Sequence, residues 1–105
     1  MSIIELYEKL RAEGFEIRDY DTRNFAVRFR TRHELSIAFN SMSYSSARFA
    51  RSYAEAIACN DVELAGFNPE GAWMRIKGSQ HSVVSSVSCE EVYRRVHAWK
   101  RRYGK

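Results

Sequence analysis

The stretch "RNFAVRFRTRHELSIAFN", residues 23–40, decides the fold that this sequence predicts. Apolar residues alternate with polar or small residues over 24–30 and again over 34–40, and the polar segment "TRHE" joins the two runs. Alternation with a period of two is typical of strands that bury one face. The stretch therefore predicts two antiparallel strands with one apolar side and one side that carries arginines.

The residues before this stretch predict a third strand and a helix. The segment "FEIRDY" (15–20) alternates in the same way, and "DTRN" (21–24) has the composition of a turn. Ser2 and Glu5 have the spacing of a capping box at the start of a helix, and Gly14 is placed to end it. The first part of the chain thus predicts a helix followed by a three-stranded meander.

The segment "ARFARSYAEAIACN" (47–60) predicts one continuous helix. Phe49, Tyr53 and Ile57 recur at intervals of four residues, which would align them on one side of a helix. Asn60 is a typical helix stop. Alanines occupy much of the remaining segment, so we expect a slim helix that packs closely on the sheet.

The last third of the chain predicts two more strands, one ambiguous segment and a long helix. The runs 62–67 and 72–78 flank the turn sequence "NPEG" (68–71), whereas 81–88 is compatible with a short strand or a loop. Ser88 and Glu91 have the spacing of a second capping box for a helix over 89–103. This helix has an apolar stripe formed by Val92, Val96, Trp99 and Tyr103.

Together these elements predict a single α+β domain over residues 1–105. The expected order is α-β-β-β-α-β-β-(β)-α, in which three helices cover the apolar face of an antiparallel sheet of about five strands. The length of 105 residues and a hydrophobic content of 45% are those of an ordinary globular domain. No motif for a cofactor is recognised, and we expect none to be bound.

The charge of the chain is concentrated in its last third. Residues 75–105 hold eight Lys or Arg against two acidic residues, whereas residues 1–74 hold nine against eleven. The long C-terminal helix carries a row of cations away from its apolar stripe: Arg94, Arg95, Arg101, Arg102 and Lys105. Such a basic ridge is typical of helices that contact phosphates, although basic residues near a helix C-terminus also stabilise the helix dipole.

Two strand faces are further candidates for binding. Trp73, Arg75 and Lys77 alternate along the run 72–78 and are expected on one face, where they could stack a base or anchor a partner protein. Arg28 and Arg30 are expected on the polar face of the meander, which has the ingredients of a single-strand or RNA platform. The alternative for the meander is an ordinary solvated face with cross-strand charge pairs.

A possible anion site precedes the predicted helix 47–60. Ser45, Ser46 and Arg48 lie where free amide groups, hydroxyls and a guanidinium group together would hold a phosphate or sulfate. The alternative is simple capping of the helix by the serine hydroxyls. The sequence leaves both interpretations open.

The sequence predicts no catalytic or metal site. His33, His81 and His97 are scattered and lack the spacing of metal ligands with Cys59 or Cys89. Two lone cysteines do not make a disulfide framework, so we expect both to be reduced. The minor alternative is a metal-independent ribonuclease that uses His81 or His97 as acid or base.

These observations favour a non-enzymatic nucleic-acid-binding module that uses the arginine-rich C-terminal helix. The alternative is a protein–protein interaction module, such as a small inhibitor of the phage or plasmid type (anti-CRISPR-like) or an adaptor that occludes a site on a larger host complex. The partner is then nucleic acid or an acidic protein surface. We expect no membrane span, because no apolar run approaches about 20 residues. We also expect no signal peptide and a cytoplasmic location, because the first residues include charges and no unbroken apolar segment. The oligomeric state is open, since the apolar stripe could also pair with a second copy.

Overall fold

The computed structural model describes residues 1–76 and 82–105, which fold around one antiparallel sheet. Its six strands are β1 (Glu16–Asp21), β2 (Asn24–Arg28), β3 (Glu34–Ala38), β4 (Asp61–Phe67), β5 (Trp73–Met74) and β6 (Val83–Ser88). The strands are ordered β1-β2-β3-β4, and the outer edge of β4 pairs with both β5 and β6. The predicted α+β class and order of elements are confirmed, and the ambiguous segment 81–88 contains the strand β6.

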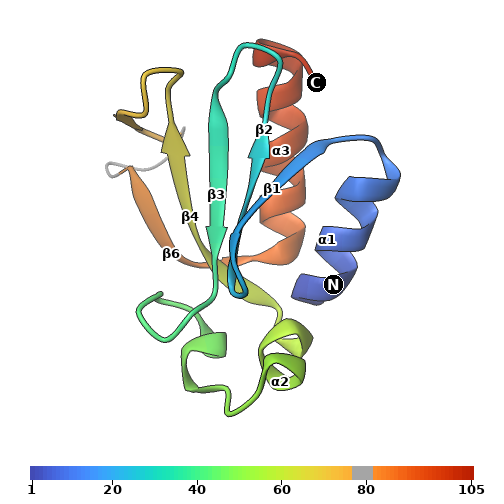
Figure 1. Ribbon diagram of the computed structural model, residues 1–105, viewed down its shortest axis with the longest axis vertical. Helices are drawn as coiled ribbons and strands as arrows, with labels where there is room; N and C mark the ends of the chain where they lie inside the picture. Colours follow the sequence, from blue (N-terminus) through green and yellow to red (C-terminus); the bar gives the residue numbers. More distant parts are fainter. Residues whose placement is uncertain (77–81) are drawn as a thin grey trace.

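The helices leave one face of the sheet uncovered. They are α1 (Ile3–Ala12), the 3-10 helix η1 (Ser46–Phe49), α2 (Tyr53–Ala58) and α3 (Cys89–Tyr103). Figure 1 shows α3 behind the sheet, α1 beside it and α2 at its lower end, with the face toward the viewer free of helices. We call this uncovered side the open face.

The core lies between the sheet and the two long helices. Strand residues Phe25, Val27, Leu35 and Ile37 are buried on the helix side, in the register Phe25 opposite Ile37 and Val27 opposite Leu35. Helix residues complete the core: Ile3, Leu6, Leu10, Val92, Val96 and Trp99. The period-two alternation over 23–40 thus decides which face of the meander is buried.

The capping signals read from the sequence are confirmed at the first helix and half confirmed at the last. Ser2 Oγ accepts a hydrogen bond from the Glu5 N–H at 3.3 Å, the Glu5 carboxylate accepts from the Ser2 N–H at 3.1 Å, and Gly14 follows the helix with φ +83°. Ser88 Oγ likewise accepts from the Glu91 N–H at 3.2 Å. The carboxylate of Glu91 does not return to Ser88, because it contacts Arg94 and Arg95 instead.

The C-terminal end of α3 is fixed to the β2–β3 turn. The Arg30 N–H donates to the Gly104 carbonyl at 3.1 Å, and the Thr31 N–H donates to the Tyr103 carbonyl at 3.3 Å. Within the turn, Arg32 adopts φ +72°, an uncommon conformation for a residue other than glycine. These contacts bring the last residues of the chain next to the arginines of the turn.

The prediction of one continuous helix over 47–60 was wrong. The chain forms η1, becomes extended at Ala50 (φ −67°, ψ 134°) and then starts α2 with Ser52 as its N-cap. Ser52 Oγ accepts from the Glu55 N–H at 3.1 Å, which favours a new helix start over continuation. As a result Phe49 is 80% exposed and Tyr53 51% exposed, instead of lying with Ile57 on one packed stripe.

The two cysteines are free thiols. Cys59 is half-buried, and Cys89 is fully buried at the start of α3. Burial, the largest cause, raises the pKa of the Cys89 thiol to about 12. Cys89 therefore acts as a small apolar side chain in the core rather than as a nucleophile.

Within residues 1–76 and 82–105, each helix is too short or too polar to cross a bilayer.

Candidate functional site

The basic ridge expected on α3 is partly neutralised by a carboxylate of the same helix. Arg94 lies 2.6 Å from one oxygen of Glu91, and Arg95 lies 3.0 Å from the other. These contacts, chiefly the hydrogen bond from Arg94, hold the pKa of Glu91 below its usual value. The first half of the ridge therefore presents a carboxylate bridged by two guanidinium groups rather than a free row of cations.

In the second half of the ridge, Lys105 is separated from Arg101 and Arg102. Arg101 and Arg102 are exposed, and the Arg102 guanidinium lies 5.6 Å from the centre of the Tyr103 ring. Lys105 leaves the ridge and turns toward the end of α1. There its ammonium group donates to the Glu13 carbonyl and lies 4.9 Å from the centre of the Phe15 ring.

Five cations from separate segments gather at the end of the sheet where β2 leads into β3. They surround a hollow of about 430 Å³, which we call the basic hollow. Its cations are Arg18 on β1, Arg28 at the end of β2, Arg30 and Arg32 on the β2–β3 turn, and Lys105 at the chain end. Gly14, Glu16 and Phe29 complete the lining.

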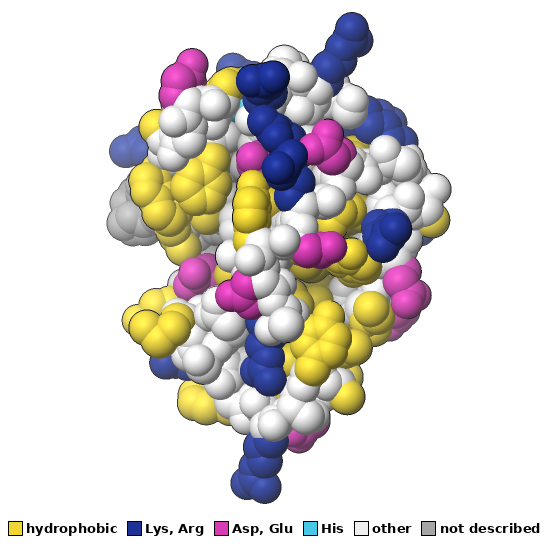
Figure 2. All heavy atoms as spheres, in the orientation of Figure 1, with side chains coloured by type: hydrophobic (Ala, Val, Ile, Leu, Met, Phe, Trp, Pro, Cys, Tyr) yellow, Lys and Arg dark blue, Asp and Glu magenta, His cyan; other side chains and the backbone are white. Residues whose placement is uncertain are grey.

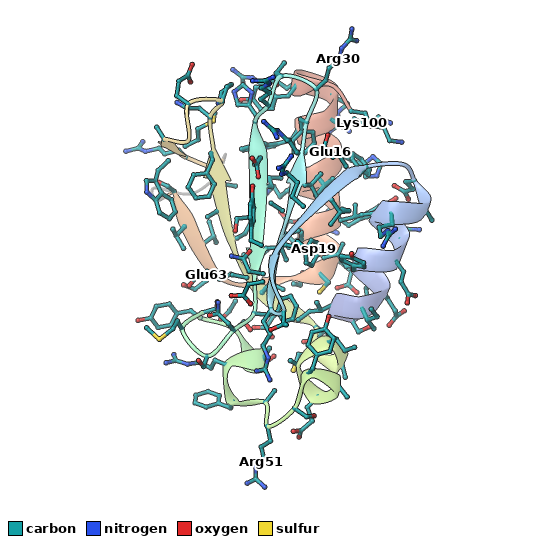
Figure 3. The ribbon with its side chains drawn as sticks, in the orientation of Figure 1. Glu16, Asp19, Arg30, Arg51, Glu63 and Lys100 are labelled. Carbon is teal, nitrogen blue, oxygen red and sulfur yellow. The ribbon has the colours of Figure 1, made fainter. Side chains whose placement is uncertain are left out.

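Two carboxylates offset part of this positive charge: Glu16, which lines the basic hollow, and Glu34, which lies directly opposite Arg28 on β3. Glu16 lies 3.3 Å from Arg18, with both side chains largely exposed. Figure 3 shows Arg30 extending away from the molecule at this end, with Glu16 below it on β1 and Glu63 farther along the sheet. Arg28, Arg30 and Lys105 were predicted as binding residues, although on two separate surfaces. The fold brings them together and adds Arg18 and Arg32.

The connection between β2 and β3 also packs on the end of α3. His33, which follows the β2–β3 turn, stacks on Tyr103 with ring centres 3.7 Å apart. Burial is the largest cause and lowers the pKa of His33, the carboxylate of Glu70 opposes this shift, and the positive charge of Arg102 lowers the pKa further. The lowered pKa favours the neutral form of His33.

The basic hollow adjoins a second hollow on the open face. This hollow, of about 320 Å³, is lined by Arg28 and Arg32 as well as by Tyr20 and Phe67. Tyr20 donates its hydroxyl to Glu34, and burial together with this bond raises the pKa of Tyr20. Figure 2 shows this face, with Lys and Arg side chains over its upper half and Asp and Glu side chains between them.

The predicted face of Trp73, Arg75 and Lys77 is only partly described. Trp73 is 60% exposed and packs against Phe67 with ring centres 4.7 Å apart. Arg75 is exposed just after β5, and Lys77 lies outside the described residues. Trp73 lines a third hollow of about 260 Å³ on the open face, next to the one that contains Tyr20.

The serines of the possible anion site already have partners in the chain. Ser45 is buried and caps the Ala47 N–H at 3.0 Å, while the Ser46 N–H donates to the Asp61 carboxylate at 3.1 Å. The Arg48 guanidinium lies over the Tyr44 ring at 5.2 Å. An external anion at this turn would have to compete with the Asp61 carboxylate.

His97 has partners within the chain. His97 Nε2 lies 2.8 Å from Glu13, and its ring packs edge-on against Phe15. The pKa of Glu13 is lowered chiefly by the hydrogen bond from Tyr93. His81 lies outside the described residues. Among the residues that the structure describes, no three His, Cys, Asp or Glu side chains are grouped closely enough to hold a metal ion.

Comparison of the chain with family models, with curated proteins and with solved structures gives no match.

Proposed function

We propose that the protein is a non-enzymatic nucleic-acid-binding module whose binding surface is centred on the basic hollow. The observation that carries this proposal is the meeting of five cations from β1, β2, the β2–β3 turn and the chain end around one hollow, where they outnumber the carboxylates of Glu16 in its lining and Glu34 beside Arg28. The arginines of α3 contribute less, because Arg94 and Arg95 share Glu91.

The arrangement is unfavourable for the isolated protein and favourable for a bound polyanion. Like charges that surround one hollow repel one another, and this repulsion is relieved when phosphates enter. Guanidinium groups also fit phosphate oxygens in a bidentate manner. Four of the five cations are exposed and Arg28 is half-buried, so the charged groups are accessible to a nucleic-acid backbone.

The test compares two double variants that remove the same charge from different surfaces. Arg28→Ala/Arg32→Ala is expected to weaken binding of an oligonucleotide about 10- to 100-fold and to reduce the slope of log K against log salt by about two. Arg94→Ala/Arg95→Ala is the matched control, with an expected loss of less than about 3-fold, since its guanidinium groups are already paired. Fluorescence anisotropy between about 50 and about 200 mM salt measures both quantities.

Each other outcome contradicts a defined part of the proposal. Equal losses in the two variants would mean that net charge, and not the basic hollow, determines affinity. A larger loss of affinity in the α3 variant would mean that the binding surface is the ridge predicted on α3. If the unmodified protein binds neither single strands nor duplexes at the lowest salt, it is not a nucleic-acid-binding module.

A second candidate function is protein interaction, as an inhibitor or adaptor, through a patch on the segment between β3 and α2. Met42 is 85% exposed, Tyr44 and Phe49 are also largely exposed, and the Arg48 guanidinium lies over both aromatic rings. Figure 2 shows hydrophobic side chains exposed toward the lower part of the molecule. Aromatic residues, Met and Arg are enriched among interface residues.

Affinity capture from nuclease-treated lysate distinguishes the two candidate functions. If the patch binds a protein, the unmodified chain and Arg28→Ala/Arg32→Ala are both expected to capture that protein. Met42→Ala/Phe49→Ala is expected to lose this capture. Quantitative mass spectrometry of the captured proteins measures this difference. If no protein distinguishes the patch variant from the unmodified chain, the second candidate is wrong.

A further inference from the structure

An exposed tryptophan on the uncovered side of the sheet points to a specific use of that side. The described chain has Trp99 in the core and Trp73 on the open face, 60% exposed. Phe67 pairs with Trp73 across β4 and β5, and the two rings are tilted by 42°. Tryptophan is highly buried on average, so an indole exposed on a sheet face is an unusual surface feature.

Small side chains form a shallow floor between the aromatic residues. Ser36, Ala38 and Ala65 line the hollow next to Trp73 and Phe67, and Ser36 and Phe67 also line the neighbouring hollow that contains Tyr20. Ser36 and Ala65 are directly opposite each other on β3 and β4. The open face therefore has aromatic rings at both sides and a shallow floor between them. A planar ring, such as a nucleic-acid base, fits this shape.

We propose that this open face binds the unpaired bases of a single-stranded nucleic acid, with bases stacked on Trp73 and Tyr20 and adjacent phosphates held at Arg28 and Arg32. This inference rests on the proposed function and assigns its substrate class. Arg28 and Arg32 line both the basic hollow and the Tyr20 hollow, so a strand held by its phosphates there reaches the aromatic residues directly. A duplex keeps its bases paired and stacked and cannot make these contacts.

The acidic residues on this face determine how the strand lies. Glu34 accepts from Tyr20, and Glu63 accepts from the Tyr44 N–H at 3.0 Å. Glu63 disfavours phosphates farther along the sheet. Glu34 lies directly opposite Arg28 and lines the Tyr20 hollow, so the phosphates are expected on the side of Arg28 and Arg32 that faces the basic hollow. The carboxylate oxygens can accept hydrogen bonds from the amino groups of bases.

Intrinsic fluorescence tests this proposal, because Trp73 and Trp99 differ in exposure. The probes are a single-stranded oligonucleotide of about 12 nucleotides as DNA and as RNA, the corresponding duplexes, and heparin as a polyanion without bases. At least one single strand is expected to quench tryptophan emission and to bind about 10-fold more tightly than its duplex, whereas heparin binds without stacking on the indole. Comparison of the DNA and RNA arms identifies the preferred strand.

Trp73→Ala is expected to lower single-strand affinity about 10-fold while leaving heparin affinity unchanged. Phe49→Ala is the matched control, because it removes another exposed aromatic ring, 80% accessible and outside the open face. It is expected to change neither affinity. A melting curve for each variant shows that the fold is retained.

The possible failures are distinguishable. If heparin, duplex and single strand bind equally and Trp73→Ala has no effect, the proposed use of the open face is wrong while the proposed function stands. If no nucleic acid and no heparin binds, the proposed function itself fails. Binding of heparin alone overturns both, since the basic hollow would then be a site for another polyanion.

Discussion

Replacing Trp99 with alanine is expected to lower the free energy of unfolding by about 3 to 5 kcal/mol. Trp99 is 8% exposed on α3, and its ring packs against Phe29 at 5.8 Å and Tyr103 at 5.2 Å between centres. Truncation removes this contact surface and leaves a cavity between the helix and β4. Urea denaturation followed by far-ultraviolet circular dichroism measures the loss.

Trp73→Ala is the control for this prediction. Both substitutions remove an indole, but Trp73 is 60% exposed, so its loss is expected to change stability by about 0.5 kcal/mol or less. If Trp99→Ala does not fold, Trp99→Phe provides a milder truncation whose loss lies between the two. Equal effects of Trp73→Ala and Trp99→Ala would contradict the assignment of one tryptophan to the core and the other to the surface.

The same core residue also supports the candidate site. Trp99 fixes the last turns of α3 on the sheet, and the carbonyls of Tyr103 and Gly104 accept from the Thr31 and Arg30 N–H groups. These bonds hold the end of the chain, and with it Lys105, beside the β2–β3 turn. Destabilising the packing around Trp99 therefore also loosens the basic hollow, so binding assays on Trp99 variants must be made well below their melting temperatures.

The meander could be predicted because one physical constraint determines it. Alternation over 23–40 permits only one side to be buried, and the observed register follows, with Phe25 opposite Ile37 and Arg28 opposite Glu34. The first helix was equally predictable, since both of its signals are local. Ser2 and Glu5 lie within one turn of each other, and Gly14 directly follows the last turn.

The break in the predicted helix 47–60 could not be found from local propensity. Its alanines favour a helix, but Asp61 on β4 binds Ser46 and fixes the start of η1, and Ser52 starts a second helix. The contact with Asp61 depends on how β4 is paired in the sheet. A sequence window that contains the helix alone therefore gives no sign of it.

Part of the candidate site depends on contacts between distant residues, and part depends on spacing within one helix. The basic hollow joins residues from positions 18 to 105, and these become neighbours only when the chain end binds to the β2–β3 turn. In contrast, the pairing of Glu91 with Arg94 and Arg95 has the i,i+3 and i,i+4 spacing of helix neighbours. That spacing is visible in the sequence, but the ridge was predicted from its cations alone, so the partial neutralisation of its first half was missed.

Gly66→Ala is expected to lower the free energy of unfolding by about 2 to 3 kcal/mol, although Gly66 lies in a strand where alanine is normally tolerated. A Cβ atom at Gly66 would lie 2.8 Å from Cη2 and 3.2 Å from Cζ2 of Trp99, and 3.4 Å from the Met74 carbonyl oxygen. The nearest obstacle is a rigid ring held on α3 rather than a flexible chain end. The helix must therefore shift to admit a single methyl group, and thermal or urea unfolding measures the cost.

A double-mutant cycle with Trp99→Phe tests this cause. The smaller ring no longer reaches the position of the new methyl group, so Gly66→Ala should cost about 1 kcal/mol less in the Trp99→Phe background than in the unmodified chain. Gly71→Ala is the matched control. It has φ +82° and no neighbour within 4 Å, so its cost of about 1 to 2 kcal/mol comes from the backbone and should be the same in both backgrounds. If both alanine substitutions are additive with Trp99→Phe, the close approach of Trp99 does not limit the side chain at position 66, and the proposed cause of the Gly66→Ala effect is wrong.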